Sequence, residues 1–285
     1  MGKQQTARGN LTGSRPQLTS VSNPIVKRLR SLERKKARKE TGLFLVEGAR
    51  HLTEAMTHGW TVDTLVMSVE AAQRPGAQAL IKLGEDQGAR LSTCSEKVLS
   101  SISNRDNAQT IVGAVKKRER SVQDLRQSPG WGVVALYQPR DPGNLGTIIR
   151  TADMASLRGV VVVGEACDLY APETVRASMG SLFACPVVFC DLDDLIDAKT
   201  EWGAALIGAS VDGDGPETWP EARPGAEPVL FMGNEQAGLS PAAEDACDAL
   251  IRLPMRPGAD SLNLASASAV MIYEAWRRLG YPGAA

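Results

Sequence analysis

Histidine is scarce in this sequence, since only His51 and His58 occur among 285 residues, both in the N-terminal part. A Ser-His-Asp hydrolase or a histidine-rich metal site is therefore hard to build. No apolar run approaches the roughly 18 residues of a membrane span, and the N-terminus lacks the apolar stretch of a secretory signal. These absences count against membrane, secreted and histidine-dependent classes of protein.

Paired cysteines are missing as well. The five cysteines include no C-x-x-C spacing. An odd number in a chain of this length argues against a disulfide framework. We therefore expect reduced, mostly buried thiols and a cytoplasmic location.

The usual glycine signatures of nucleotide binding are also absent. The sequence contains neither a Gly-x-Gly-x-x-Gly fingerprint nor a G-x-x-x-x-G-K-[ST] phosphate loop. This counts heavily against a nucleotide-dependent oxidoreductase on a doubly wound sheet. A cofactor, if the protein uses one, must be held in another way.

Positive charge is concentrated near the N-terminus, although the whole chain has a net charge of only −1. Such a density suits contacts with nucleic-acid phosphates, and it equally suits a solvated helix face. Charge alone does not choose between them. The cations between residues 27 and 39, opposed only by Glu33, are Lys27, Arg28, Arg30, Arg34, Lys35, Lys36, Arg38 and Lys39.

The first part of the chain has the pattern of a small α/β unit over residues 21–117, preceded by a flexible tail over residues 1–20. One basic helix is expected over 24–38, capped by Ser22 or Asn23, with Pro24 in its first turn. Residues 118–130 are polar and are expected to form a linker. Strands are expected at Leu43–Val46, Thr64–Met67, Arg90–Thr93 and Thr110–Val115, and helices at 49–57, 71–86 and 95–102.

Residues 131–285 read as a second, larger α/β domain. Short apolar runs separated by helical patterns indicate a parallel sheet covered on both faces. Helices are expected at 145–156, 173–180 and 262–279. The expected strands are Gly132–Tyr137, Val160–Val163, Pro186–Phe189, Ala204–Ile207, Val229–Met232 and Leu250–Leu253.

A first segment with chemical potential, Asp141–Ala152, follows a strand and opens a helix. Its two glycines permit a tight turn, and Asn144 can cap the helix or bind a ligand. Arg150 lies inside that helix among apolar or small residues. It must therefore point to an anion, a partner subunit or solvent, and solvent is the ordinary case for a helical arginine.

Two further segments end strands in the second domain. An apolar strand leads into Gly233-Asn234-Glu235 and then Gly238-Leu239. An ordinary capped turn would explain the Ser240 that follows but not the carboxylate of Glu235, and carboxylates at strand ends face the ligand crevice of open α/β sheets. The third segment runs from Pro254-Met255 to Ser261-Leu262-Asn263 and then into a helix of small residues. The alternative, purely structural interpretation of this segment is a capped, tightly packed C-terminal helix.

Together and in this order, these segments resemble the three motifs of the SpoU/TrmH class of SPOUT RNA methyltransferases. The matching residues are Asn144-x-Gly146-x-x-x-Arg150, Gly233-Asn234-Glu235-x-x-Gly238-Leu239, and Pro254-Met255 with Ser261-Leu262-Asn263. The stretch from Arg176 to Phe183 is similar to this class too. The third motif reads Leu-Asn-Leu-Ala-Ser where many members have Leu-Asn-Val-Ser, a mild departure.

A weaker resemblance covers the first half, from Ser22-Asn23-Pro24 to Phe44-x-Val46-Glu47-Gly48. It is similar to the ribosomal-protein-like RNA-binding domain of many rRNA-directed members. This raises the phosphate-contact interpretation of the basic helix. The residues that the resemblance assigns to RNA binding are Lys27, Arg28, Arg34, Lys35 and Arg38.

The class resemblance implies a parallel α/β sheet with a deep trefoil knot, a homodimer with active sites at the subunit interface, and S-adenosylmethionine bound in the knot. Periodicity alone would never suggest a knot. It also implies methylation of a ribose 2′-hydroxyl in RNA, most readily 23S rRNA. Carried over by position, the cofactor contacts are Met232, Gly233, Asn234, Leu253, Met255, Ser261 and Leu262.

The resemblance makes Arg150 the leading catalytic residue, with Asn144, Glu235 and Asn263 shaping the substrate pocket. Arginine rarely gives up its proton, so we favour phosphate orientation and stabilisation of the developing alkoxide over base catalysis. No metal is required, because the methyl donor loses its positive charge as it reacts. Methylation of tRNA or 16S rRNA, an antibiotic-resistance role, and a non-catalytic ribosome-assembly factor are the alternatives.

Overall fold

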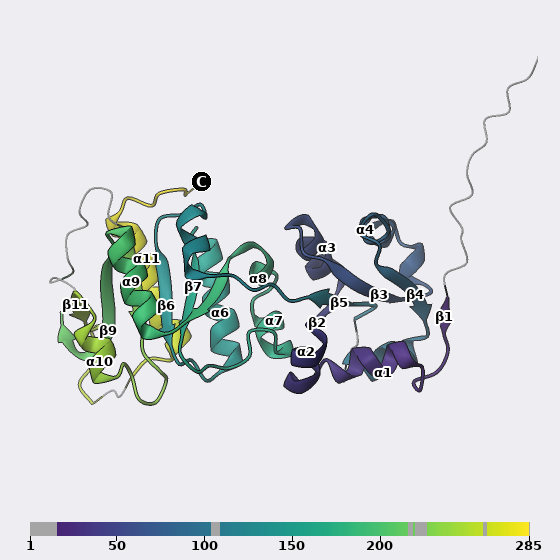
Figure 1. Ribbon diagram of the computed structural model, residues 1–285, viewed down its shortest axis with the longest axis horizontal. Helices are drawn as coiled ribbons and strands as arrows, with labels where there is room; N and C mark the ends of the chain where they lie inside the picture. Colours follow the sequence, from purple (N-terminus) through teal and green to yellow (C-terminus); the bar gives the residue numbers. More distant parts are fainter. Residues whose placement is uncertain (1–15, 104–108, 216–218, 220–226, 259–260, 285) are drawn as a thin grey trace, which may run out of the picture.

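The computed structural model describes residues 16–103, 109–215, 219, 227–258 and 261–284. They form two α/β bodies placed side by side along the long axis of the molecule (Figure 1). Each body has its own sheet, with five strands in the first and six in the second. None of the helices in these ranges is both long and apolar enough to cross a membrane.

The N-terminal body has a mixed sheet in the order β1-β4-β3-β5-β2. The first three of these strands run parallel, and β5 pairs antiparallel with both β3 and β2. Its strands are β1 Gln17–Leu18, β2 Leu43–Glu47, β3 Val62–Ser68, β4 Arg90–Cys94 and β5 Ile111–Lys116. Its helices are α1 Pro24–Ser31, α2 Lys35–Thr41, α3 Ala49–Thr57, α4 Pro75–Asp86 and α5 Glu96–Ser103, with a 3-10 turn at Ala71–Gln73.

The C-terminal body has six strands in the order β11-β9-β10-β6-β7-β8, all paired in parallel. Buried apolar clusters lie against both faces, which confirms the doubly covered parallel sheet predicted from the apolar runs. The strands are β6 Val133–Tyr137, β7 Gly159–Val163, β8 Val187–Cys190, β9 Ala205–Asp214, β10 Pro228–Met232 and β11 Ala249–Ile251. The helices are α6 Pro142–Met154, α7 Pro172–Ala177, α8 Ser181–Ala184, α9 Leu192–Trp202, α10 Pro241–Asp245 and α11 Leu264–Arg278.

The single basic helix expected over residues 24–38 was wrong, because the chain forms α1 and α2 with a break at Leu32–Arg34. The break is stabilised by the Arg38 side chain, whose Nη1 donates to the carbonyls of Leu32 and Glu33, both at 2.7 Å. These carbonyls lie at the end of α1, where a helix leaves acceptors without partners.

Two segments expected to be unstructured contain ordered elements. In the expected tail, Gln17–Leu18 pairs with β4 and Leu18 is buried; residues 1–15 lie outside the described residues. In the expected linker, Val122–Gln127 forms a 3-10 helix with a capping box between Ser121 and Asp124. Val122 and Leu125 are buried in the C-terminal body. Their burial keeps this segment ordered although most of its residues are polar.

Aromatic side chains join the two bodies. Phe44 and Trp60 of the first body pack against Tyr170 and Phe183 of the second, with ring centroids 4.6 Å apart for Phe44–Tyr170 and 5.5 Å for Trp60–Phe183. The indole of Trp60 also donates to the Phe183 carbonyl at 3.0 Å. The apolar core therefore runs continuously from one body to the other.

A buried ion pair lies beside this aromatic contact. Arg38 donates from Nε and Nη2 to Asp168 Oδ2 at 3.0 and 2.7 Å, and its side chain is only 4% exposed. Its donors are occupied within the protein, so Arg38 is withdrawn from the RNA-binding set predicted from the sequence. The resemblance assigned it by its place in a basic run, and only the tertiary contact shows its structural role.

Replacing Asp168 by asparagine should lower the free energy of unfolding by about 3–5 kcal/mol, because the Arg38 charge would remain buried without its partner. Urea denaturation measures this loss. Glu40→Gln is the control, since it removes a carboxylate from the exposed Lys36–Glu40 pair and should cost at most about 1 kcal/mol. Equal stabilities of the two variants would contradict the structural role of the buried pair.

Candidate functional site

The three segments singled out in the sequence meet at the carboxyl edge of the six-stranded sheet. The loop after β6 leads into α6, with Pro142 in its first turn and Asp141 as N-cap. The loop after β10 carries Gly233 to Gly238, and the segment after β11 leads to α11, capped by Asn263. Strand ends at this edge of an open parallel sheet are the usual place of a ligand site.

Glu235, Asn144 and Asn263 form a continuous hydrogen-bond network, called here the Glu-Asn-Asn network. Glu235 Oε1 accepts from Asn144 Nδ2 at 3.2 Å, and Asn144 Oδ1 accepts from Asn263 Nδ2 at 3.0 Å. Asn263 Oδ1 then accepts from two backbone N–H groups in the first turn of α11. The network thus ties α6, the loop after β10 and α11 to one another.

The carboxylate of Glu235 also accepts from the backbone N–H groups of Arg140 and Asp141 at 3.1 and 3.2 Å. Desolvation by burial raises the pKa of Glu235, but hydrogen bonds from backbone groups and from Asn144 outweigh it, so the net pKa is lowered from 4.5. Glu235 is therefore ionised at neutral pH, and its negative charge holds three donors in place.

The turn after β10 is tightly built. The backbones of Asn234 and Gly238 exchange two hydrogen bonds, at 2.9 and 3.0 Å. The Asn234 side chain donates to the Gln138 carbonyl at 2.7 Å and accepts from the N–H groups of Gln236 and Ala237. A Cβ on Gly233 would lie 2.5 Å from the carbonyl carbon of Gly238, so only glycine fits there.

A cavity of about 530 Å³ opens beside this turn, within the size range of small-molecule sites. Its lining mixes backbone, apolar and a few polar groups. Glu235 lines the cavity, and so do all of the residues that the sequence resemblance assigns to the cofactor. These residues are Met232, Gly233, Asn234, Leu253, Met255, Ser261 and Leu262.

The cavity also has polar lining residues that sequence reasoning missed, namely Ser210, Asp212, Glu244 and Arg252. Glu244 Oε1 accepts from the Ser210 hydroxyl at 2.9 Å. The first two lie in β9, which runs to Asp214, well beyond the Ile207 expected from its apolar run. The signal that could have found them is their position near the carboxyl end of a parallel strand.

Arg150 lies outside this cavity. It is exposed on α6 and, within the described part of the chain, has no hydrogen-bond or ion-pair partner. It shares the exposed stripe of α6 with Thr147 and Met154. The chain therefore brings Asn144, Glu235 and Asn263 together and leaves the side chain of Arg150 exposed.

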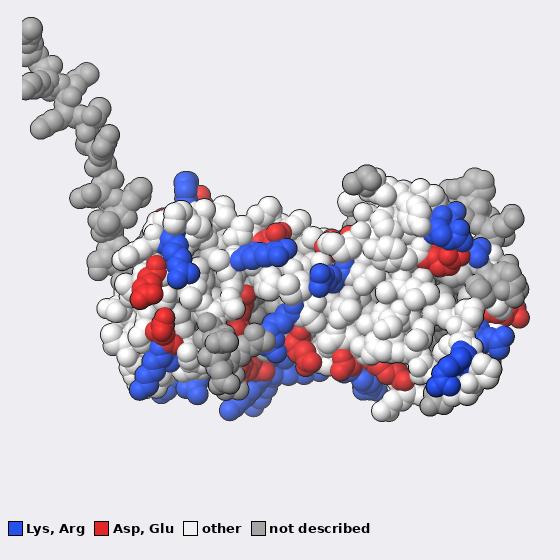
Figure 2. Space-filling model, turned by 180° about the vertical axis from the view of Figure 1, so that it is seen from behind, with Lys and Arg blue, Asp and Glu red and all other residues white. Residues whose placement is uncertain are grey.

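The structure separates the basic residues expected to bind RNA into exposed side chains and side chains that are paired within the protein. Lys27 on α1 and Arg34 and Lys35 at the start of α2 are exposed. Arg28 is partly neutralised by Asp63 at 3.2 Å. Figure 2 shows Lys and Arg side chains gathered along the lower edge of the molecule, where Figure 1 places α1 and α2, with acidic residues among them.

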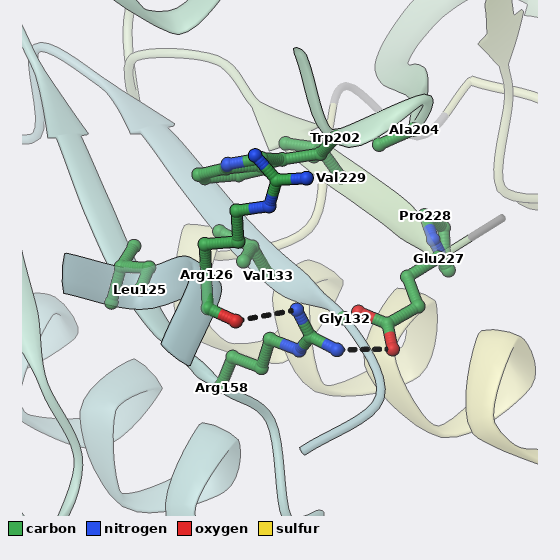
Figure 3. A pocket seen from close by; sticks show the side chains of 10 residues that line it. All are labelled: Leu125, Arg126, Gly132, Val133, Arg158, Trp202, Ala204, Glu227, Pro228 and Val229. Atoms are coloured by element: carbon green, nitrogen blue, oxygen red, sulfur yellow. Dashed lines mark hydrogen bonds and ion pairs between the residues drawn. The ribbon is translucent and has the colours of Figure 1, made fainter. Parts of the chain in front are cut away.

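A second, smaller cavity of about 100 Å³ lies at the opposite edge of the same sheet, where β6 and β10 begin. In it, Arg158 donates to the Arg126 carbonyl at 3.3 Å and to the Glu227 carboxylate at 2.6 Å (Figure 3). These contacts link neighbouring loops to each other. The cavity is distant from the three motifs, and none of their residues lines it.

Two sequence profiles match the chain. A profile of the SpoU rRNA Methylase family matches residues 132–273, and one of the MRM3-like substrate binding domain matches residues 23–113. A 23S rRNA (uridine(2479)-2′-O)-methyltransferase of Streptomyces viridochromogenes is 31% identical, over 95% of this chain and 96% of the relative. A 23S rRNA (guanosine(2553)-2′-O)-methyltransferase of Bacillus subtilis is 30% identical, over 90% and 98%.

Solved structures agree in fold. An AdoMet-bound rRNA methyltransferase from Sinorhizobium meliloti superposes with a TM-score of 0.85 at 40% identity, covering 92% of this chain and 98% of that one. Together with these relatives, the parallel sheet and the cavity at its carboxyl edge define an α/β enzyme of the methyltransferase class. The chain belongs to the SpoU rRNA Methylase family.

Glutamine in place of Glu235 should lower methylation about 10- to 100-fold, because an amide cannot accept from all three donors and leaves one unsatisfied. Incorporation of labelled methyl groups at saturating substrate measures the loss. Glu201→Gln, which removes a carboxylate from an exposed pair with Arg126, is the control and should behave as the wild type. A fully active Glu235→Gln enzyme would rule out the need for the carboxylate.

The same variant should alter the acid stability of the protein. Because the folded-state pKa of Glu235 lies below 4.5, its carboxylate stabilises the fold fully above that pH. This contribution is lost as the pH falls through the lower folded value. Thermal unfolding from pH 6 down to pH 3 should therefore show a smaller decrease in Tm for Glu235→Gln than for the wild type.

Proposed function

We propose that this protein transfers the methyl group of S-adenosylmethionine to a ribose 2′-hydroxyl of 23S rRNA. The observation that carries the proposal is the cavity at the carboxyl edge of the sheet, lined by the motif residues and joined to the Glu-Asn-Asn network. Two relatives that match nearly the whole chain are 23S rRNA 2′-O-methyltransferases.

The cavity fits S-adenosylmethionine in size and in the character of its walls. It combines apolar side chains such as Met232 and Leu253 with backbone groups of the turn at Gly233. A backbone-lined slot of this kind can take an adenine ring without a glycine-rich phosphate loop. When bound, the cofactor supplies an electrophilic methyl group.

The chain's own residues then position the nucleophile. The Glu-Asn-Asn network fixes the loop after β6 against the start of α11, so that the walls of the substrate pocket do not have to reorganise. Arg150 orients the phosphate next to the target ribose and stabilises the alkoxide as the hydroxyl loses its proton to solvent water. The guanidinium keeps its own proton throughout.

The proposal includes a homodimer, with the C-terminal body threaded as the trefoil knot of the class. The exposed stripes of α6 and α11 support a dimer, since the two helices pack together and expose Met154, Val270 and Tyr273 at 58%, 48% and 47%. Apolar side chains grouped on one surface mark a protein interface. In such a dimer, Arg150 on the same surface of α6 would reach the partner's site.

The N-terminal body would bind RNA next to the methylation site. The exposed cations Lys27, Arg34 and Lys35 provide phosphate contacts, and the aromatic contact between the bodies keeps this surface at a fixed position relative to the cavity. Such an arrangement suits a large folded RNA that touches both bodies at once.

Purified protein, tritiated S-adenosylmethionine and protein-free 23S rRNA, 16S rRNA and tRNA, assayed in parallel, test the proposal. We expect label in 23S rRNA at one nucleotide, in a linkage that resists alkaline hydrolysis because the 2′-oxygen is blocked. Label confined to tRNA or 16S rRNA would overturn the substrate. Cofactor binding that is absent altogether would favour a non-catalytic assembly factor.

A further inference from the structure

The segment that leaves β5 and connects the two bodies is rich in cations. It comprises Lys117, Arg118 and Arg120, interrupted only by Glu119, and Lys117 lies near Lys35 of α2. We call Lys35, Lys117 and Arg120 the junction cations. None of these three has an ion pair with an acidic side chain among the described residues, whereas Arg38 close by is already paired with Asp168.

Contacts within the protein hold this segment in one shape. The backbone N–H and carbonyl of Arg118 both bond to the Tyr170 hydroxyl, at 3.1 and 2.7 Å, and the Lys117 N–H donates to the Gly42 carbonyl at 2.8 Å. Arg118 stacks over Trp60, with its guanidinium carbon 4.6 Å from the ring centroid, and Lys117 Nζ lies 5.2 Å from the Tyr170 centroid. Arg118 therefore has a structural role: its contacts hold the segment in place and so fix the positions of Lys117 and Arg120.

Like charges are gathered here against their mutual repulsion. Burial is the main cause that lowers the pKa of Lys117; Asp168 and Glu119 oppose the decrease, and Arg38 and Lys35 add to it. The pKa of Arg118 is also lowered, first by burial and then by the charge of Arg120. An excess of one sign at a fixed, partly desolvated place is the electrostatic pattern of an anion-binding surface.

The position of the junction cations indicates which kind of anion binds to them. Tyr170 and Asp168 belong to the loop after β7, at the same carboxyl edge of the sheet as Asn144 and Glu235. Within that loop the Cys167 N–H donates to the Pro139 carbonyl at 2.9 Å, just before α6 begins. An RNA strand that binds at the junction would therefore continue along this edge of the sheet toward the candidate site.

We propose that Lys35, Lys117 and Arg120 form a phosphate-binding track for the RNA backbone between the N-terminal body and the methylation site. The track rests on the proposed function and extends it, because it places the substrate strand across the joint of the two bodies. Its contacts are with phosphates, so it sets the register of the strand and reads no base.

Salt-dependent binding of labelled, protein-free 23S rRNA tests the track directly. Each phosphate contact contributes about 0.7–0.9 to the slope of log Kobs against log salt, so Lys117→Gln should lower the slope by about that amount and Lys117→Gln/Arg120→Gln by about twice as much. In methylation assays the loss should appear in KM for RNA. Binding of S-adenosylmethionine alone should be unaffected.

Lys82→Gln is the matched control, because it removes one exposed cation from α4, where Lys82 pairs with Asp86. It should leave the slope as in the wild type. If Lys117→Gln lowers Tm, then Lys117→Arg, which keeps the charge, should restore both the slope and KM. Junction variants with the wild-type slope and KM would overturn the track, whereas a wild-type protein that binds 23S rRNA and transfers no methyl group would overturn the proposed function instead.

Discussion

Alanine in place of Arg150 should lower kcat for RNA methylation by about 100- to 1,000-fold, the usual effect of removing one donor that stabilises developing negative charge. Binding of S-adenosylmethionine should not change, because Arg150 lies outside the cavity proposed for the cofactor. Stability should change by no more than about 0.5 kcal/mol, since the side chain is exposed and makes no hydrogen bond or ion pair among the described residues. Single-turnover methylation at saturating RNA measures the effect.

Arg150→Lys refines this test. Lysine keeps the charge but loses the planar fork that binds a phosphate through two hydrogen bonds. A lysine enzyme close to wild type would show that charge alone is enough, and an alanine enzyme with full activity would remove Arg150 from the mechanism.

A mixing experiment can decide whether Arg150 acts in its own subunit or in the partner. In the proposed homodimer, Arg150→Ala is expected to be nearly inactive, and Gly233→Ala is expected to be nearly inactive at a concentration of S-adenosylmethionine well below the Kd of that variant. If Arg150 serves the partner's cavity, an equal mixture allowed to exchange subunits should recover about a quarter of wild-type activity, because half of the dimers contain one intact site out of two. A mixture that stays inactive would place Arg150 at its own subunit's cavity.

Gly233→Ala should weaken S-adenosylmethionine binding about 10- to 100-fold, because overpacking at this position costs a few kcal/mol. The added Cβ would lie 2.5 Å from the carbonyl carbon of Gly238 and 2.6 Å from the Leu239 nitrogen, and both are backbone atoms that cannot rotate away. The turn would have to open, and the cavity wall that it forms would move with it. Isothermal titration with S-adenosylmethionine measures the change.

Gly76→Ala is the control for this substitution. It adds the same methyl group in the first turn of α4, where no atom lies within 4 Å of the new Cβ. Cofactor affinity should then equal that of the wild type. Unchanged affinity in Gly233→Ala would mean that the turn at Gly233 does not form the cofactor site.

Several elements were predictable from the sequence because their signals are local. The apolar strand runs predicted β6, β7 and β10 to within one residue at each end. The helices expected at 145–156 and 262–279 begin instead at Pro142, capped by Asp141, and at Leu264, capped by Asn263. Helix α9 was missed, although Asp191 and Asp194 form a readable capping box before its apolar positions. Its charged sequence hid a helix with only Leu195 and Ala198 buried.

Other features depend on contacts between residues far apart in the chain. Arg38 looks like its basic neighbours in sequence, yet it is buried against Asp168, 130 positions away. The strand at Gln17–Leu18 is too short to show a pattern and exists because β4 offers it a free edge.

By itself, the sequence determined that two α/β units follow one another, that the second has a parallel sheet, and that three polar motifs end strands at one edge. Hydrophobic periodicity, turn residues and helix caps are encoded within short windows, so they can be read in one dimension. Only the tertiary structure decided that Glu235, Asn144 and Asn263 bond to one another, that Arg150 lies outside the cavity, and that Arg38 joins the two bodies. These depend on distances across the fold, which the packing of both faces of the sheet sets and no local pattern records.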